Sequence, residues 1–346
     1  MLVAGLAVSA SAQHYSQTNL VSNVSANAPK TDANLVNGWG LARSSGGPWW
    51  VSDNGTGKST LYDGTGTPQA LVVTVPGAPT GTVFNGSSSF TLAPGKPAAF
   101  LFASEDGTIS GWNPGVNATV AQIAVTTANA VYKGLAIGSV NGVLRLYAAD
   151  FHAGRVRMFD ANFQEITASK GRGDDDDEGG FFGSPRGLAP FNIQNIGGTL
   201  YVAFAKQDSA KHDEVDGAGL GLVGAFTTSG RFIRWFEHVS DLNAPWGMAI
   251  APSDFGAFSH HLLVGQFGSG QILAFNLETG AYAGKMIDAA GNTLAIEGLW
   301  GISFGNDAKA GPATTLYFAA GPNGEANGLF GSLTAVSTDN FLGNGN

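Results

Sequence analysis

Short runs of alternating apolar and polar residues, separated by glycine and asparagine turns, make up most of this chain. The stretch WWVSDNGTGKSTLYD from Trp49 holds two such runs around a tight turn, and FLFASEDGTISGWN from Phe100 repeats the arrangement. Related stretches begin at Arg145, Leu200 and Leu262. A period of two between apolar positions predicts strands with one buried face, and the polar turns predict antiparallel hairpins. The pattern therefore predicts an all-β protein.

These hairpins belong to a longer repeat, in which each is preceded by a short strand with a shared glycine. The six opening segments are WGLAR at Trp39, TGTVF at Thr80, KGLAI at Lys133, RGLAP at Arg186, WGMAI at Trp246 and WGISF at Trp300. They recur roughly every 50 residues, a spacing typical of repeat architectures. Six four-stranded antiparallel sheets around an axis form a β-propeller.

The predicted propeller must close into a ring, yet its sixth repeat has too few residues after Val336 for a fourth strand. The segment TNLVSN, from Thr18 to Asn23, can supply that outer strand. We therefore expect a single six-bladed domain over residues 13–340, closed by its N-terminal strand, with a tail at 341–346.

Composition, charge and the N-terminal segment indicate which classes of binding partner are disfavoured and where the protein is located. The formal net charge is −9 and there is no cysteine, which disfavours nucleic-acid binding and excludes disulfides and thiolate chemistry. Leu2 to Ala12 is apolar and ends in a small-residue pattern typical of a signal-peptidase site. We expect residues 1–12 to be a signal-peptide remnant, the mature protein to be exported from Gln13 onward, and no transmembrane segment.

The first strand of each blade lines the channel of a propeller, so the residues before the shared glycines should surround one channel mouth. Trp39, Trp246 and Trp300 would then offer indole faces to a sugar-like ring, and Lys133 and Arg186 would hold an anionic group. The alternative is that the tryptophans fill the channel while the cations pair with acids such as Glu297. The sequence leaves both open.

Two acidic segments are candidate metal sites. The insertion KQDSAKHDEVDGAGLG, Lys206 to Gly221, contains Asp208, Asp213 and Asp216, whose oxygens suit Ca²⁺. A solvated acidic loop and a lid over the channel are the alternatives. The run GRGDDDDEGG, at residues 171–180, is typical of a solvent-exposed charged stretch. Turn acids such as Asp53, Asp106 and Asp150 favour hairpin turns through backbone bonding.

Several stretches together resemble a known group of proteins. These are LYAADFHAGRVRMFD, PFNIQNIGGTLYVAFAKQD, KHDEVDGAG, LNAPWGMAIAP and GLWGISFG. They resemble a family of uncharacterised, mostly bacterial, exported propellers known only by a numbered family model, over residues 17–336. The architecture is more distantly similar to NHL-type and gluconolactonase-like propellers. The resemblance implies the fold and export but no established activity.

Three functions follow as hypotheses. The first is an exported propeller that binds a small polar or glycan-like ligand at the channel mouth. The second is a Ca²⁺-dependent hydrolase, lactonase or lyase at the same mouth, with Asn37, Asp208, Asp213 and Glu297 as further candidate groups. The third is an envelope scaffold for a protein partner.

Overall fold

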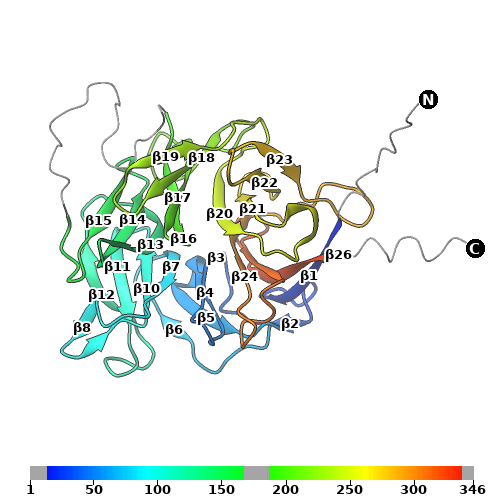
Figure 1. The fold of residues 1–346 in the computed structure, drawn as a ribbon. Coiled ribbons are helices and arrows are strands. Elements are labelled where there is room, and N and C mark those ends of the chain that lie inside the picture. Colours follow the sequence, from blue (N-terminus) through cyan, green and yellow to red (C-terminus); the bar gives the residue numbers. More distant parts are fainter. Residues whose placement is uncertain (1–13, 167–184, 186, 337–346) are drawn as a thin grey trace, which may run out of the picture.

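The strands of the computed structural model form six antiparallel sheets around a central axis (Figure 1). The structure describes residues 14–166, 185 and 187–336, so the predicted leader (1–12), acidic run (171–180) and C-terminal tail (341–346) lie outside the described residues. Within the described part, the only helical turns are the short 3₁₀ segments Asn54–Thr56 and Gly256–Phe258. No helix there could span a membrane.

Each blade is a meander that runs from the axis outward, as the alternating pattern predicts. Blade one is β3 (Gly38–Ala42), β4 (Trp49–Asp53), β5 (Lys58–Tyr62) and β6 (Val73–Thr74); blade two is β7 (Pro79–Phe84), β10 (Phe100–Ser104), β11 (Thr108–Trp112) and β12 (Gln122–Thr126). Blade three is β13 (Tyr132–Val140), β14 (Val143–Asp150) and β15 (Arg155–Phe159); blade four is β16 (Ala189–Ile196), β17 (Thr199–Ala205), β18 (Gly221–Thr227) and β19 (Phe232–Trp235). Blade five is β20 (Pro245–Ile250), β21 (His261–Gln266), β22 (Ile272–Asn276) and β23 (Tyr282–Lys285); blade six starts with β24 (Leu299–Phe304), β25 (Leu316–Ala320) and β26 (Leu329–Val336). A small separate hairpin, β8 (Thr91–Ala93) and β9 (Lys96–Pro97), lies in the connection between β7 and β10 of blade two.

The predicted closure by the N-terminal strand is confirmed. Strand β1 (His14–Ser22) pairs antiparallel with β26, from His14 opposite Val336 to Ser22 opposite Leu329, and it is the fourth strand of blade six. Figure 1 shows β1 in blue beside β26 in red. The short β2 (Lys30–Thr31) pairs with β1 in parallel. The strand begins before the predicted Thr18 because Tyr15 is also buried against blades five and six.

The hydrophobic core is divided among the interfaces between blades. Six apolar clusters each lie between two neighbouring sheets, and a seventh lies on the axis. Both faces of the inner strands are therefore buried, because each sheet packs against a neighbour on either side. This explains why strand segments such as Phe100–Ser104 are buried at every position.

The shared glycines lie where neighbouring inner strands cross closely. A Cβ on Gly40 would lie 2.4 Å from the Thr80 carbonyl oxygen, and one on Gly247 would lie 2.4 Å from that of Trp300. No side chain fits at either position, which is the packing reason for the repeated glycine.

Blade four departs from the predicted alignment. A Cβ on Gly134 would lie 2.8 Å from the Cα of Asn192, so Asn192 occupies the place of the shared glycine in this blade. The axial residue is then Phe191, and the predicted alignment at Arg186 is wrong because β16 begins only at Ala189. Arg186 itself lies outside the described residues. The Asn192 amide donates to the Trp246 carbonyl oxygen at 2.7 Å and so joins blades four and five.

Candidate functional site

The tryptophans of the inner strands fill the channel. Trp39 and Trp300 stack with ring centroids 3.7 Å apart, and Trp246 packs against both at 6.3 and 5.9 Å. Phe191 completes this cluster at 5.8 Å from Trp300. All four side chains are buried. The structure therefore places the three predicted indoles together at the centre of the propeller, with Trp39 and Trp300 stacked face to face and Trp246 meeting Trp300 edge-on.

Lys133 lies beside this aromatic plug and is fully buried. Its ammonium is 5.0 Å from the Trp39 ring centroid, bonds the Glu105 carboxylate, and lies 3.1 Å from Asp213 Oδ1. Burial lowers the pKa of Lys133, but Glu105 outweighs this effect and the pKa is raised. The carboxylate partners of Lys133 are thus Glu105 and Asp213, whereas the sequence had suggested Glu297 as the pairing acid. Two carboxylates already neutralise the ammonium.

Asn37 connects the plug to the polar groups above it. Its side-chain oxygen accepts a hydrogen bond from Trp300 Nε1 at 2.9 Å, and its amide donates to Glu325 Oε1 at 3.0 Å. The backbone of Asn37 has φ of 49°, a left-handed conformation that asparagine tolerates better than most residues. The residue therefore fixes both an indole and a carboxylate of the channel mouth.

The insertion from Lys206 to Gly221 connects β17 to β18 and lies over the channel mouth. Asp213 reaches the axis through its contact with Lys133. Asp208 has a local role, since its Oδ1 accepts the His212 backbone N–H at 2.9 Å. Asp216 lines a hollow nearer to blades five and six. The three predicted metal ligands thus separate into three different environments.

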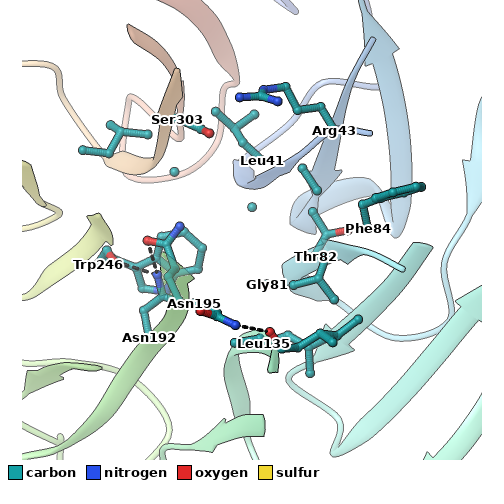
Figure 2. Close-up of a pocket in the computed structure, with 18 residues that line it drawn as sticks. Leu41, Arg43, Gly81, Thr82, Phe84, Leu135, Asn192, Asn195, Trp246 and Ser303 are labelled. Atoms are coloured by element: carbon teal, nitrogen blue, oxygen red, sulfur yellow. Dashed lines mark hydrogen bonds between the residues drawn. The ribbon is translucent and has the colours of Figure 1, made fainter. Parts of the chain in front are cut away.

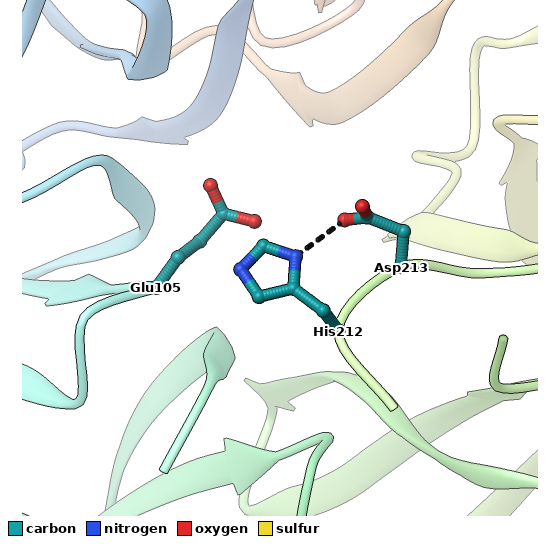
Figure 3. Close-up of side chains that lie close together, drawn as sticks. All are labelled: Glu105, His212 and Asp213. Atoms are coloured by element: carbon teal, nitrogen blue, oxygen red, sulfur yellow. Dashed lines mark hydrogen bonds and ion pairs between the residues drawn. The ribbon is translucent and has the colours of Figure 1, made fainter. Parts of the chain in front are cut away.

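A different group in the described residues has the spacing that a metal ion needs. Glu105, His212 and Asp213 each offer a ligand atom within 4.8 Å of the others, and His212 Nδ1 is 2.9 Å from Asp213 Oδ1 (Figure 3). Glu105 comes from the turn of blade two, so local sequence could not pair it with the insertion. The Lys133 ammonium contacts two of these carboxylates and therefore occupies part of the same position.

Beside this group lies a hollow that we call the acidic mouth. It has a volume of about 380 Å³ and is lined by Asp216, Glu297 and Glu325, by Phe267, and by backbone of the neighbouring turns. Phe267 stacks on Trp300 with ring centroids 4.0 Å apart. Glu325 has a strained left-handed backbone, with φ of 67°. The fold therefore places carboxylates around a hollow whose floor is the aromatic ring of Phe267.

Burial makes the carboxyl groups of Glu214, Asp216 and Glu325 harder to ionise. Burial raises the pKa of Glu214 to about 7, against the lowering effect of Lys133 and with a further rise from Glu325. Burial also raises the pKa of Asp216 and of Glu325. At Asp213 burial is outweighed by Lys133, which lowers the pKa. These shifts are expected where several acids share one desolvated space with a single lysine.

The recurring turn acids have separate structural environments. Asp106 accepts the N–H and hydroxyl of Thr108, as expected for a turn residue. Asp150 is buried and pairs with Arg157 Nε at 2.7 Å. Asp53 is buried and neither of its carboxyl oxygens has a hydrogen-bond partner in the described structure.

Comparison with known proteins identifies relatives over most of the chain. Uncharacterized protein R648 of Acanthamoeba polyphaga mimivirus is 33% identical over 334 residues, which cover 91% of this chain and 78% of the relative. Uncharacterized protein L690 of the same virus is 31% identical over 328 residues, which cover 91% of this chain and 84% of the relative. The chain belongs to the family of these mimivirus proteins. No family model matches this member, and its curated relatives are viral, so the expectation of a mostly bacterial family defined by a numbered model is corrected.

Solved structures with the same architecture have little sequence in common with this family member. A catalytically inactive variant of virginiamycin B lyase from Staphylococcus aureus, solved with quinupristin, matches with a TM-score of 0.52 at 14% identity, over 94% of this chain and all of the lyase. A protein of unknown function from Bacteroides thetaiotaomicron matches with a TM-score of 0.56 at 13% identity, over 94% of this chain and 76% of that protein. At such identities the likeness shows the fold.

Proposed function

We propose that this propeller binds a small polar ligand at its acidic mouth, and that the ligand carries a protonated amine. The observation behind the proposal is the set of carboxylates around the hollow. Asp216, Glu297 and Glu325 line a space of about 380 Å³, and none of them forms an ion pair with the described part of the chain. A cationic ligand would supply the missing partner.

Phe267 strengthens this proposal. An aromatic ring within reach of a cation attracts it through the ring quadrupole, and the carboxylates add charge-assisted hydrogen bonds. The sugar-acid ligand expected from Lys133 and Arg186 is less suitable here, since the Lys133 ammonium already has two carboxylate partners. The proposal keeps the predicted location and changes the charge of the ligand.

The test is calorimetric titration with putrescine, a small diamine, and with its uncharged diacetyl derivative as the matched probe. We expect putrescine alone to bind, and Asp216→Asn to weaken binding roughly tenfold, as for loss of one charge-assisted bond. Asp254→Asn is the control, since this exposed acid lies between β20 and β21, at the opposite end of the blade. Equal binding of both probes, or equal effects of the two substitutions, would contradict the proposal.

Ligand binding should also depend on pH. Glu214 has a pKa raised to about 7 by burial, so this mouth becomes less negative as pH falls through that value. We expect putrescine affinity to fall between pH 8 and pH 6 in the wild type. In Glu214→Gln this dependence should be reduced.

A metal-dependent hydrolase or lyase is the second candidate, favoured by the spacing of Glu105, His212 and Asp213. A metal ion there would displace the Lys133 ammonium from two of its carboxylate partners. The melting temperature after chelation, and again with Ca²⁺ or Zn²⁺ restored, tests this candidate because a ligand of the folded state raises stability. A rise abolished by His212→Ala would support it, and no rise would count against it.

A further inference from the structure

The end of the channel opposite the acidic mouth contains a second cavity, which we call the neutral pocket. Its volume is about 320 Å³. Most lining residues lie at or just after the shared glycine position of the inner strands, and all six blades contribute to the cavity (Figure 2). Trp246 of the aromatic plug forms part of its wall. The plug therefore separates two cavities of one channel.

The charge of the neutral pocket differs from that of the acidic mouth. No carboxylate is among the described residues that line it, and Arg43 is its single charged lining residue. Arg43 Nε donates to the Phe304 carbonyl oxygen at 2.8 Å, and Nη2 donates to that of Gly305 at 2.9 Å. The guanidinium is thus largely engaged by the protein. A cation has no counter-charge here.

Amide and hydroxyl groups give the pocket its polarity. Asn192, Gln194 and Asn195 come from blade four, and Ser303 comes from blade six. Gln194 Oε1 accepts the Met248 N–H at 2.7 Å, which fixes the side chain and leaves its Nε2 without a partner in the described structure. Ser303 Oγ likewise has no described partner. The Asn192 and Asn195 side chains bond the protein, so Gln194 Nε2 and Ser303 Oγ are the neutral groups that these two blades offer to a ligand.

An aromatic side chain lies at the same pocket. Phe84 is 38% exposed, although its ring packs 5.3 Å from that of Phe100, and it lines the cavity with Leu41 and Ile137. Phe84 brings an exposed aromatic side chain from blade two and the amides come from blade four, so the cavity suits a ligand that is apolar on one face and hydroxylated at its edge. Such a ligand is a sugar ring.

We propose that the neutral pocket is a second binding site, specific for one neutral saccharide unit. The volume is near the lower end of small-molecule sites, so it suits a single ring. The nearly neutral lining disfavours polyamines and polyanions, whereas uncharged hydroxyls can pair with the Gln194 amide and with Ser303. This site is independent of the acidic mouth, since the two cavities share no lining residue.

The experiment is saturation-transfer NMR, followed by calorimetry, with glucose, mannose and N-acetylglucosamine as probes on the full chain. We expect at least one of them to bind. Ser303→Ala should weaken its binding about three- to tenfold, as for loss of one hydrogen bond. Phe84→Ala should weaken it further. The matched control is Phe232→Ala, because Phe232 is also an exposed phenylalanine, at 43%, on outer strand β19 of blade four.

Three outcomes would overturn the proposal: no binding of any of the three sugars, an equal loss in Phe232→Ala, or displacement of the sugar by putrescine. The last outcome would place the sugar at the acidic mouth. If Phe84→Ala fails to fold, Ser303→Ala and Phe84→Leu still test the site, since both retain the packing. Sugar binding without putrescine binding would support this proposal and count against the acidic-mouth proposal, so the two fail separately.

Discussion

Replacing Lys133 with methionine should be among the most destabilising single changes at the channel. The Lys133 side chain is 1% exposed and its partner Glu105 is 15% exposed. Removing one partner of a buried ion pair costs about 3 to 5 kcal/mol, because the other charge stays buried. Asp213 is 63% exposed and regains water, so it adds little. Since Glu105 keeps some exposure and its bond from Asn54, we expect a loss of about 2 to 3 kcal/mol.

The assay is equilibrium urea unfolding at pH 7. The control is Lys285→Met. The distance from Lys285 Nζ to Asp241 Oδ2 is 3.1 Å, the same as from Lys133 Nζ to Asp213 Oδ1, but both side chains of the control pair are 33% exposed, so the pair should contribute less than about 1 kcal/mol. The double variant Lys133→Met with Glu105→Gln should recover part of the lost stability, since no charge is then stranded. Equal losses for Lys133→Met and Lys285→Met, or strict additivity in the double variant, would refute this reasoning.

Two further predictions concern the core. Gly40→Ala should destabilise the protein by about 2 kcal/mol or more, because the new Cβ would lie 2.4 Å from the Thr80 carbonyl oxygen. The control is Gly46→Ala, whose Cβ would have no atom within 4 Å, and we expect it to be nearly neutral in thermal unfolding. Asp53→Asn should stabilise the protein by roughly 1 kcal/mol at pH 8, since the buried Asp53 carboxyl lacks a partner. Burial raises the pKa of the Asp53 carboxyl above its unfolded value of about 3.9. The stability that the protonated carboxyl contributes is therefore fully present below the unfolded pKa and is lost as pH rises through the folded pKa. A stability advantage of Asp53→Asn over the wild type that is as large at pH 4 as at pH 8 would contradict this explanation.

The sequence predicted the blades well because paired strands of one hairpin are close in sequence and have a recognisable residue pattern. Alternation and turn glycines occur within each hairpin, and the closing strand could be inferred because the sixth repeat lacked a fourth strand. Blade four was misaligned for a physical reason. The glycine sought in RGLAP is replaced by Asn192, whose side chain bonds a neighbouring blade. A search for glycine alone misses a position where a polar side chain joins the strands.

The candidate sites were less predictable because they depend on which distant turns meet. The axial residues Trp39, Trp246 and Trp300 were correctly grouped, but their burial depends on how the rings pack across the channel. The contact between Lys133 and Glu105 joins the inner strand of blade three to a turn of blade two, and no local pattern in either blade indicates it. The neutral pocket was not predicted, although Trp246 and motif residues such as Leu41 and Ser303 line it, because the motif does not reveal that a cavity remains beyond the aromatic plug.

The pairing of β1 with β26 has a consequence for biosynthesis. His14 lies opposite Val336, so β1 leaves the ribosome well before its partner and can pair only after all the intervening blades have been translated. Until then β1 has an exposed edge, and blade six lacks its outer strand. Non-local pairing of this kind slows folding and leaves time for misassociation between nascent chains. The strand that completes the ring therefore depends on a segment that is synthesised only after the other five blades.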